Sequence, residues 1–391
     1  MPPPTPRRPR PSPRRPRRRH PPPHPVPGNP LFPRSSLIPL HTSARRTALL
    51  LTAVSIALTA SACATSGTTD ADTTATATAT RSASTAPTAE PALTKKEALA
   101  QIAHYSKINN EANADNNRKL LHTIEDGPLY AMSVADYKQD EGLPKADREK
   151  YKPWSYDLAS TDVYIPRFTA GQPKWFAAVT YSGKNNKYAR VLIMAEQPQA
   201  QRWEMVAAVD LDDKKQVPKI ALDADGYATA IDATSTKAVA APADVLRAAV
   251  IDNFSTGGDL TGKKVFAPTK TSKRQIKVHD ETIHKFGSRG TTEFSSAVTE
   301  FPDSYALKTA DGRALVVLAH THTQRDAVAH SGLQIVPDKE DRAWLGTTPS
   351  PSFTYTFTCS DVATVPTTPG KSQLIGYTCR RTDAEGLSTS A

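Results

Sequence analysis

The stretch from residue 44 to 63, ARRTALLLTAVSIALTASAC, limits most strongly what this chain can become. Arg45 and Arg46 precede a run of fourteen residues, 47–60, that contains no charged side chain. Small residues follow at positions 60–62. A positive segment, a short apolar run and a small-residue cleavage site together indicate an export signal. The chain downstream of residue 62 is therefore expected to fold outside the cytoplasm.

Cys63 directly follows the small residues, so that residues 44–62 resemble a bacterial lipoprotein signal peptide. The resemblance implies that the Cys63 thiol is acylated, with palmitate as a typical fatty acid, before the signal is removed. Lipoprotein signals usually have leucine three residues before the cysteine, where this chain has Ala60. The implied location is the extracytoplasmic face of the cell membrane, with the membrane itself as a partner through the lipid anchor.

Two alternatives to lipidation remain open. An ordinary secretory signal cut after Ala62 fits the same small residues. An uncleaved membrane anchor is the other, although the fourteen-residue apolar run is shorter than the roughly 20 residues that a spanning helix needs. All three interpretations place most of the chain outside the cytoplasm.

Residues 1–43 have an extreme composition, with 16 prolines and nine arginines. Such a segment has few large apolar side chains to bury, and proline donates no backbone hydrogen bond, so we expect it to be disordered. It is either a basic, polyproline-rich arm for anionic partners or an artefact of a translation start placed too far upstream. Signal cleavage would remove it in both cases.

The net charge of +10 comes from this upstream segment. Residues 1–46 contain 11 arginines and no acidic residue, which leaves 49 − 11 = 38 basic residues against 39 acidic residues in the remainder. The mature protein is therefore close to neutral, at −1. A nucleic-acid partner is not expected, because it would require a basic patch on the folded region itself.

Residues 63–92 form a low-complexity stretch of threonine, alanine and serine, with no large hydrophobic side chain before Leu93. It is expected to be a flexible tether with a reach of roughly 30 Å. About 300 residues follow, enough for two domains of ordinary size. We predict an α+β fold of two similar modules, 93–238 and 239–391, each with a helix packed on a curved antiparallel sheet.

The first module begins with a clear helix signal. Thr94 and Glu97 form a capping box, and the helix is expected from Lys95 towards Ile124, with a kink or break in the polar segment 109–117 and an end at Gly127-Pro128. The pattern then becomes alternating. Strands are predicted at 163–168, 174–181, 189–195 and 202–211.

The second module repeats this order. Helices are predicted from about Pro242 and over 272–286, and Asp311-Gly312 predicts a hairpin turn. Strands are predicted at 293–301, 305–309, 314–323, 353–365 and 373–380.

This arrangement resembles tandem cystatin-like or NTF2-like modules. The combination of the lipoprotein signal, the Thr/Ala tether and strands such as KWFAAVTY resembles actinobacterial surface lipoproteins of uncharacterised function. The resemblance implies a fold and a location, and it includes no catalytic motif.

Cystatin-like folds often bind ligands in the concavity between helix and sheet, so outward-facing members of an aromatic cluster could line a groove there. The alternative is that these aromatic residues are core. The cluster comprises Trp154, Tyr156, Tyr164, Phe168, Trp175, Phe176 and Tyr181.

Cys359 and Cys379 remain once Cys63 is assigned to the lipid. Pro369 lies midway between them, so that a hairpin turning there would place the two cysteines opposite each other. An exported compartment permits disulfides, and we predict one here. Two reduced structural cysteines are the alternative, because strand registers are often shifted by a bulge.

His320 and His322 are the strongest candidates for chemistry in the chain, and they are weak ones. Residues i and i+2 of a strand share a face, so both imidazoles could face one metal ion, with His330 or Asp326 completing the site. Exposed histidines on a polar strand edge are the more common situation, and we predict no metal and no cofactor.

The sequence lacks the serine-hydrolase motif G-x-S-x-G, the Walker A motif and G-x-G-x-x-G. The expected function is therefore that of a non-catalytic binding or structural protein of the cell envelope, with an unknown envelope protein or ligand as its partner. The alternative is an envelope enzyme or small-ligand carrier with a pocket in one module.

Overall fold

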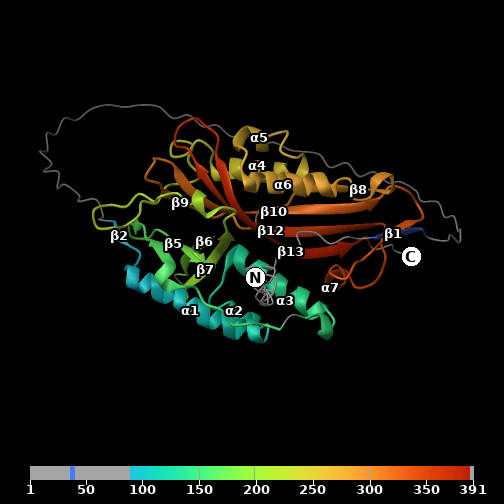
Figure 1. Cartoon of the computed structure of the whole chain (residues 1–391), viewed down its shortest axis with the longest axis horizontal. Helices are drawn as coiled ribbons and strands as arrows, with labels where there is room; N and C mark the ends of the chain where they lie inside the picture. Colours follow the sequence, from blue (N-terminus) through green and yellow to red (C-terminus); the bar gives the residue numbers. More distant parts are fainter. Residues whose placement is uncertain (1–35, 40–88, 149, 198, 299, 388–391) are drawn as a thin grey trace, which may run out of the picture. The chain divides into compact units, whose positions relative to one another are not determined.

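The computed structural model describes residues 36–39 and 89–387, apart from 149, 198 and 299 (Figure 1). The signal peptide, Cys63 and most of the tether lie outside the described residues. Among the described residues, no helix is long and apolar enough to cross a lipid bilayer.

Helix α1 (Lys95–Ala114) begins with the predicted capping box. The Thr94 side chain accepts the Glu97 amide hydrogen, and the Glu97 carboxylate accepts the Thr94 amide hydrogen over 2.8 Å. The helix ends within the polar segment, where Asn116 has a φ of 51°. The short α2 (Arg118–Leu121) and then α3 (Gly127–Gly142) follow. The predicted break is therefore confirmed, and α3 is an additional helix.

The first sheet is an antiparallel meander with strand order β3-β5-β6-β7. Its strands are β3 (Thr161–Tyr164), β5 (Trp175–Ser182), β6 (Tyr188–Gln197) and β7 (Arg202–Asp210), and β4 (Arg167–Phe168) lies beside it, paired with β2 (Glu90–Pro91). One face of this sheet is buried against the helices through Ile102 and Tyr105 of α1 and through Phe176 and Leu192 of the strands.

The second sheet follows α4 (Ala243–Ser255), α5 (Gly262–Val265) and α6 (Lys270–Thr282). Its strands are β8 (Gly290–Ser296), β9 (Ser304–Lys308), β10 (Ala314–Val328), β12 (Ser352–Val365) and β13 (Gln373–Gly386). The strand order is β13-β12-β10-β8, and β9 pairs with the first part of β10. The small α7 (Arg342–Leu345) lies between β11 (Leu333–Val336) and β12.

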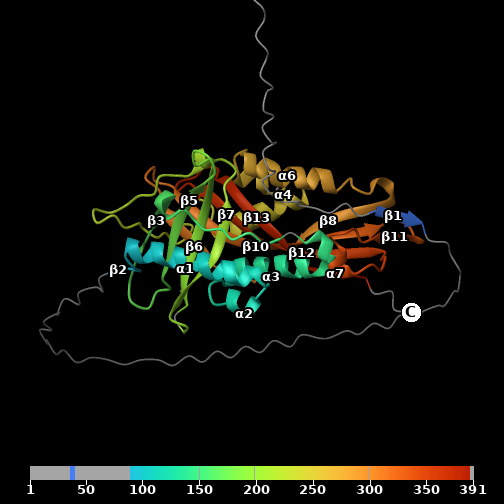
Figure 2. The same ribbon diagram turned by 60° about the horizontal axis from the view of Figure 1, so that its bottom comes forward.

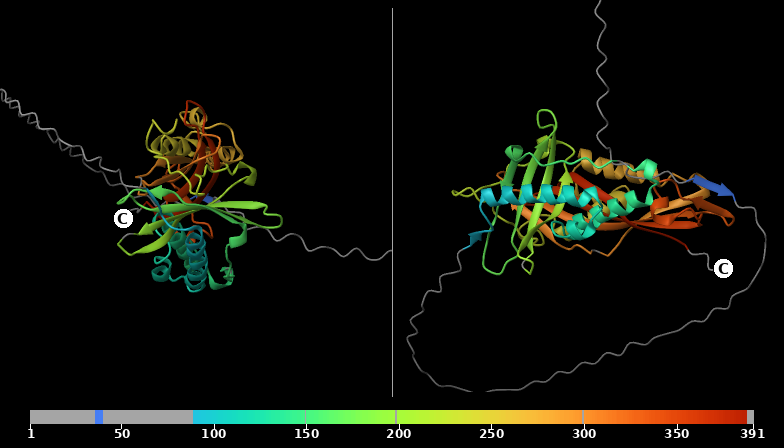
Figure 3. Two further views of the ribbon diagram at one scale, coloured as in Figure 1. Left: turned by 90° about the vertical axis from the view of Figure 1, so that its left-hand side faces the viewer. Right: turned by 90° about the horizontal axis from the view of Figure 1, so that it is seen from below.

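The described region has four layers, with helices on both outer sides and the two sheets between them (Figure 2). The end-on view in Figure 3 shows α1 and the pair α4 and α6 on opposite sides of the strands. The inner faces of the two sheets share one hydrophobic core, in which Val191 and Ile193 of the first sheet join Leu315, Val317 and Val362 of the second. Burial of both faces explains why nine consecutive residues at the start of β10 are buried.

Gly376 allows the two sheets to approach each other at one edge. A β-bridge links Leu211, just after β7, to Gly376 in β13, and the Asp212 amide donates to the Ile375 carbonyl over 3.1 Å. A Cβ atom at position 376 would lie 2.6 Å from the Asp210 carbonyl oxygen, which is closer than van der Waals contact permits. A side chain at this position would force the sheets apart.

The predicted α+β class with antiparallel sheets is confirmed. In each half, helices precede an antiparallel sheet. The division into two separate modules is not confirmed, because the sheets share a core. Cystatin-like or NTF2-like modules are likewise not confirmed.

Two segments that were predicted to be disordered or flexible form strands in the structure. Residues 36–39, within the segment 1–43 that was expected to be disordered, form β1 (Ser36–Pro39), which pairs antiparallel with β11. These four residues, Ser-Leu-Ile-Pro, include two of the few large apolar residues in that segment. At the other end of the tether, β2 already belongs to the folded region, two residues before Leu93.

Glu125 is a buried carboxyl group between α2 and α3, with 1% of its surface exposed. It accepts a hydrogen bond from the Tyr105 hydroxyl over 2.6 Å. Burial raises the pKa of Glu125 to about 7, against the opposing effect of this hydrogen bond.

The raised pKa predicts that stability depends on pH through this residue. Between about pH 4.5 and 7 the folded protein holds a proton that the unfolded chain has lost, so this stabilisation is complete below the unfolded pKa and is lost as the pH rises through 7. The free energy of unfolding of the wild type should therefore fall by about 2–3 kcal/mol from pH 5 to pH 8 because of this group. Glu125→Gln lacks the ionisable carboxyl group, so its free energy of unfolding should rise by this amount relative to the wild type over the same pH range. Urea unfolding at both pH values measures this difference. Glu111→Gln, at an exposed position in α1, is the control and should show no such gain.

Candidate functional site

A cleft of about 670 Å³ opens between the two sheets. It is bordered by the beginning of β5, the end of β6 and the middle of β7 on one side, and by β9 and β10 on the other. It lies at one end of the shared core, where the sheets no longer fill the space between them.

Aromatic side chains form much of the cleft wall. The ring of Trp175 lies edge-on to Tyr305 at 5.3 Å between centroids and edge-on to Phe168 at 6.1 Å. Phe301 also lines the cleft. Burial, reinforced by nearby carboxylates, raises the pKa of Tyr305, so its hydroxyl stays protonated and can donate a hydrogen bond.

The Ser360 hydroxyl gives the cleft a polar group in its interior. Ser360 lies opposite Ala319 on neighbouring strands, both residues line the cleft, and Ser360 is 1% exposed. Within the described part of the chain its Oγ has no hydrogen-bond partner. A buried hydroxyl without a partner is costly, so this position favours a bound group that completes its hydrogen bonding.

Carboxylates outnumber ammonium groups around the cleft. Lys174 is its one lysine or arginine among the described residues, and it pairs with Glu196 at 3.6 Å. Asp126, Glu300 and Asp303 also line the cleft. Three negative charges in excess would attract a cation.

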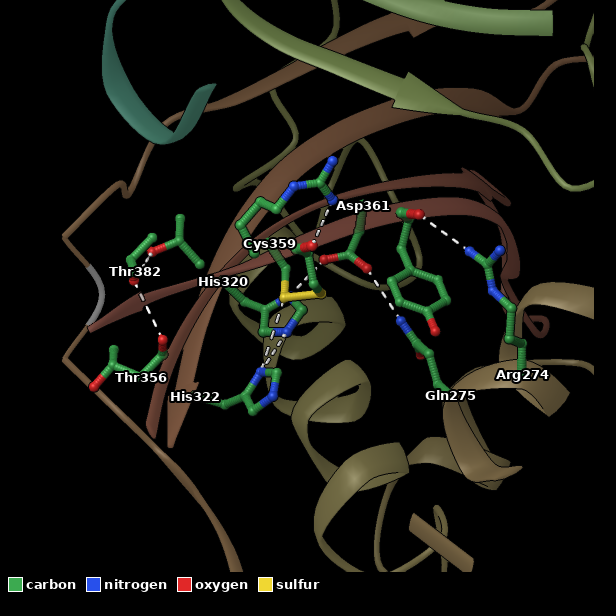
Figure 4. The surroundings of a disulfide bond; sticks show 12 residues. Arg274, Gln275, His320, His322, Thr356, Cys359, Asp361 and Thr382 are labelled. Carbon is green, nitrogen blue, oxygen red and sulfur yellow. Dashed lines mark hydrogen bonds and ion pairs between the residues drawn. A yellow bond between two sulfur atoms is a disulfide. The ribbon is translucent and has the colours of Figure 1, made fainter. Parts of the chain in front are cut away.

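A second polar cluster lies on the opposite face of the five-stranded sheet, beneath α4 and α6 (Figure 4). His320 Nδ1 and Asp361 Oδ2 are 2.5 Å apart, and His320 Nε2 and His322 Nδ1 are 3.1 Å apart. Gln275 of α6 donates to the other oxygen of Asp361 over 3.2 Å, and in turn accepts from Asn253 of α4 over 2.9 Å. The helices thus hold the Asp361 carboxylate from outside the sheet.

His322 lies between two aromatic rings. Its imidazole stacks on Phe254 of α4 at 4.6 Å and on Phe357 of β12 at 5.2 Å. Burial, followed by the neighbouring His320, lowers the pKa of His322 well below its usual range, so the imidazole is neutral. Its Nε2 has no hydrogen-bond partner among the described residues.

The predicted disulfide between Cys359 and Cys379 is present. The two cysteines are directly opposed on β12 and β13, and the register shifts by one residue between Val362 and Ala363, so the hairpin turns between residues 368 and 369. A bulge is therefore present, but it lies beyond the cysteines and leaves them in register. The prediction for Cys63 lies outside the described residues.

The expectation that His320 and His322 are exposed on a strand edge is wrong. Each has 1% of its surface exposed, because β10 is a central strand between β8 or β9 and β12, and helices cover this face. The structure brings the two imidazoles together with Cys359, and the potential ligand atoms of the three residues lie within 4.8 Å of one another. His330 is exposed, and Asp326 forms a separate ion pair with Lys285, so neither belongs to this group.

The aromatic cluster predicted from the sequence divides between two places. Phe176 belongs to the core under the helices, where Trp154 and Tyr156 also pack, on Tyr105. Phe168 and Trp175 face the other sheet and line the cleft. The groove thus lies between two sheets and not between helix and sheet. Tyr305, Ser360 and the acidic residues Glu300 and Asp303 of the loop before β9 were not singled out from the sequence, because only tertiary packing brings them to the cleft.

Comparison with known proteins shows that this chain is similar to lipoproteins of Streptomyces. It is 56% identical over 348 residues to Uncharacterized lipoprotein SCO6871 of Streptomyces coelicolor, an alignment that covers 89% of this chain and 96% of the relative. It is 25% identical over 285 residues to Uncharacterized lipoprotein SCO2278 of the same organism, covering 71% and 81% of the two chains. An uncharacterized lipoprotein of Streptomyces avermitilis is 26% identical over 267 residues, covering 68% and 77%.

The chain belongs to the family described as Domain of unknown function (DUF8094), whose model matches residues 89–386. No solved structure matches it significantly. The resemblance to uncharacterised actinobacterial lipoproteins is thus confirmed. These relatives imply a lipid anchor to the membrane and an extracytoplasmic location. The family match spans both sheets, and it begins four residues before the predicted module boundary at residue 93.

Proposed function

We propose that this chain is an exported lipoprotein, anchored through Cys63, that binds a small molecule without catalysis in the cleft between its sheets. The observation that supports this proposal is the combination of aromatic walls, an unpartnered Ser360 hydroxyl and an acidic border in one cleft. Mostly apolar clefts of this volume with a few convergent polar groups are typical of small-molecule sites.

The lining indicates the chemistry of the ligand. Trp175, Tyr305 and Phe301 offer apolar contact and ring faces, and rings of this kind attract cations. Asp126, Glu300 and Asp303 add negative charge at the same place. The ligand is therefore an apolar or aromatic molecule with a positive charge.

The alternative, an enzyme in the same cleft, requires a nucleophile beside a base. Ser360 is the hydroxyl of greatest interest there, but among the described cleft residues there is no histidine to activate it. This arrangement favours binding over hydrolysis. Hydrolytic turnover of peptide or cell-wall substrates by the purified protein would contradict the proposal.

Binding can be tested with three small aromatic probes of similar size and different charge. Saturation-transfer NMR should rank benzyltrimethylammonium above benzyl alcohol, and benzyl alcohol above benzenesulfonate. Replacing both Glu300 and Asp303 with their amides should weaken binding of the cationic probe about tenfold at low salt, equivalent to about 1.4 kcal/mol, and leave the neutral probe unchanged.

Two variants show whether the probes bind in the cleft or elsewhere on the protein. Ser360→Ala tests the interior hydroxyl and should weaken all probes that hydrogen-bond to it. The control is Trp203→Ala, because Trp203 packs on Phe176 at 5.3 Å on the helix-covered face of the first sheet. Equal binding of the anionic and cationic probes would show that the acidic border does not select the ligand.

A further inference from the structure

The group formed by His320, His322 and Cys359 lies on the face of the second sheet away from the cleft, so it is independent of ligand binding there. We propose that the Cys359–Cys379 disulfide closes a zinc-binding site, and that its reduction opens a two-histidine, two-cysteine set of ligands for Zn²⁺.

The spacing of the donor atoms fits one tetrahedral ion. Zinc–nitrogen bonds near 2.0 Å and zinc–sulfur bonds near 2.3 Å place two nitrogens about 3.3 Å apart, and a nitrogen and a sulfur about 3.5 Å apart. The observed separations are 3.1 Å between His320 Nε2 and His322 Nδ1, and 3.9 Å between His322 Nδ1 and Cys359 Sγ. Cys379 lies directly opposite Cys359 and supplies the fourth ligand once the sulfurs separate.

The surroundings of His320 match those of a metal ligand. Histidines that bind metals usually donate their second ring nitrogen to a carboxylate, which fixes the tautomer and orients the ring. His320 has this arrangement in advance, because Asp361 Oδ2 lies 2.5 Å from Nδ1 and leaves Nε2 directed at His322. Gln275 in turn orients Asp361 (Figure 4).

The disulfide explains why the site is closed in the oxidised protein. Each sulfur is bonded to the other, so neither is a thiolate, and the two imidazoles hydrogen-bond to each other instead. Lipoproteins of this kind fold outside the cytoplasm, where disulfides persist. Opening the site therefore requires a reductant, which in the envelope would be a dithiol protein.

The chemistry balances as two steps. Thiol–disulfide exchange breaks the Cys359–Cys379 bond and forms the disulfide of the dithiol, which transfers two electrons and two protons to the two sulfurs. Zn²⁺ then displaces both thiol protons as it binds the thiolates. Zn²⁺ also replaces the hydrogen bond between His320 Nε2 and His322 Nδ1. Both of these nitrogens then bind the metal, and the proton of the neutral His322 ring is carried on Nε2.

Cobalt is a suitable probe, because tetrahedral cobalt and its thiolate bonds absorb visible and near-ultraviolet light. The full-length protein in detergent should bind no Co²⁺ at the site while oxidised. After reduction with a phosphine and removal of oxygen, it should bind one Co²⁺ per chain, show sulfur-to-cobalt charge transfer, and release the cobalt when Zn²⁺ is added. Circular dichroism before and after reduction follows the fold.

Single and double variants test whether the metal binds to the proposed ligands or to other side chains. Asp361→Asn should weaken metal binding 10- to 100-fold, and His322→Ala by at least as much. The double variant Cys359→Ser, Cys379→Ser should show no charge-transfer band. His330→Ala, which removes an exposed histidine, is the control and should bind like the wild type.

Three outcomes would overturn the proposal. One is a reduced protein that binds cobalt no more tightly than the oxidised protein. Another is a charge-transfer band that survives both His322→Ala and Asp361→Asn. The third is a reduced chain that unfolds and does not regain its structure when zinc is added.

Discussion

Cys63→Ala is expected to release the protein from membranes, with a fall of at least about 100-fold in the ratio of membrane-bound to soluble protein. The physical reason is that acyl chains provide the attachment, at about 0.8 kcal/mol for each CH₂ group buried in lipid. Among the described residues no helix is long and apolar enough to span a bilayer. The apolar run before Cys63 is also short for a spanning helix. Fractionation after a high-salt wash, with mass spectrometry of the N-terminal peptide, measures both attachment and acylation.

The two alternatives give different results in the same experiment. A secretory signal cut after Ala62 predicts that the wild-type protein is already soluble and begins with an unmodified Cys63. An uncleaved anchor predicts that Cys63→Ala stays in the membrane fraction with residues 44–62 still attached. Cys359→Ser is the control, because it removes a different cysteine and should leave the protein in the membrane.

Local sequence signals predict much of the fold. The capping box at Thr94 and Glu97 marks the start of α1, because two backbone donors of the first turn find partners within four residues. Alternating apolar residues mark β5, β6 and β7, and Asp311-Gly312 marks the hairpin between β9 and β10, where Gly312 has a φ of 81°. These signals depend only on neighbours in the chain.

Gly127-Pro128 shows how one local signal can have two meanings. A glycine followed by proline is typical of a helix end, and here it predicts that the first helix stops. The same pair begins α3, because Gly127 has a φ of 58° and Pro128 occupies the first turn, where its missing amide hydrogen is not needed. A helix therefore begins where only an end was predicted.

The candidate sites depend on contacts that the sequence does not contain. Trp175 and Tyr305 meet across 130 positions, and the two sheets must pack before either residue has a cleft to line. His320 and His322 were correctly placed on one face of a strand, but their burial depends on α4 and α6. The register that brings Cys359 to Cys379 could be predicted, since it follows from one hairpin.

The largest effect on folding is expected at Asp326, at the far end of the helix-facing row of polar residues on β10. Its side chain is fully buried, and one oxygen pairs with the Lys285 ammonium at 2.8 Å. The other accepts from the Thr292 hydroxyl over 2.7 Å and from the Gln324 amide over 3.0 Å. The polar groups of Lys285, Thr292 and Gln324 therefore all have this carboxylate as a partner.

Asp326→Ala should lower the free energy of unfolding by about 3–5 kcal/mol, because the Lys285 ammonium, with only 15% of its side chain exposed, would lose its buried counter-charge. Urea denaturation measures the loss. A second substitution, Lys285→Met, should restore much of the stability in the Asp326→Ala background, since a buried pair costs most when only one partner is removed. Glu281→Ala breaks the exposed Lys277–Glu281 pair of α6 and is the matched control, with an expected effect below about 0.5 kcal/mol. If Lys285→Met added its own full cost to that of Asp326→Ala, the two charges would be acting independently, and the proposed role of the buried pair would be wrong.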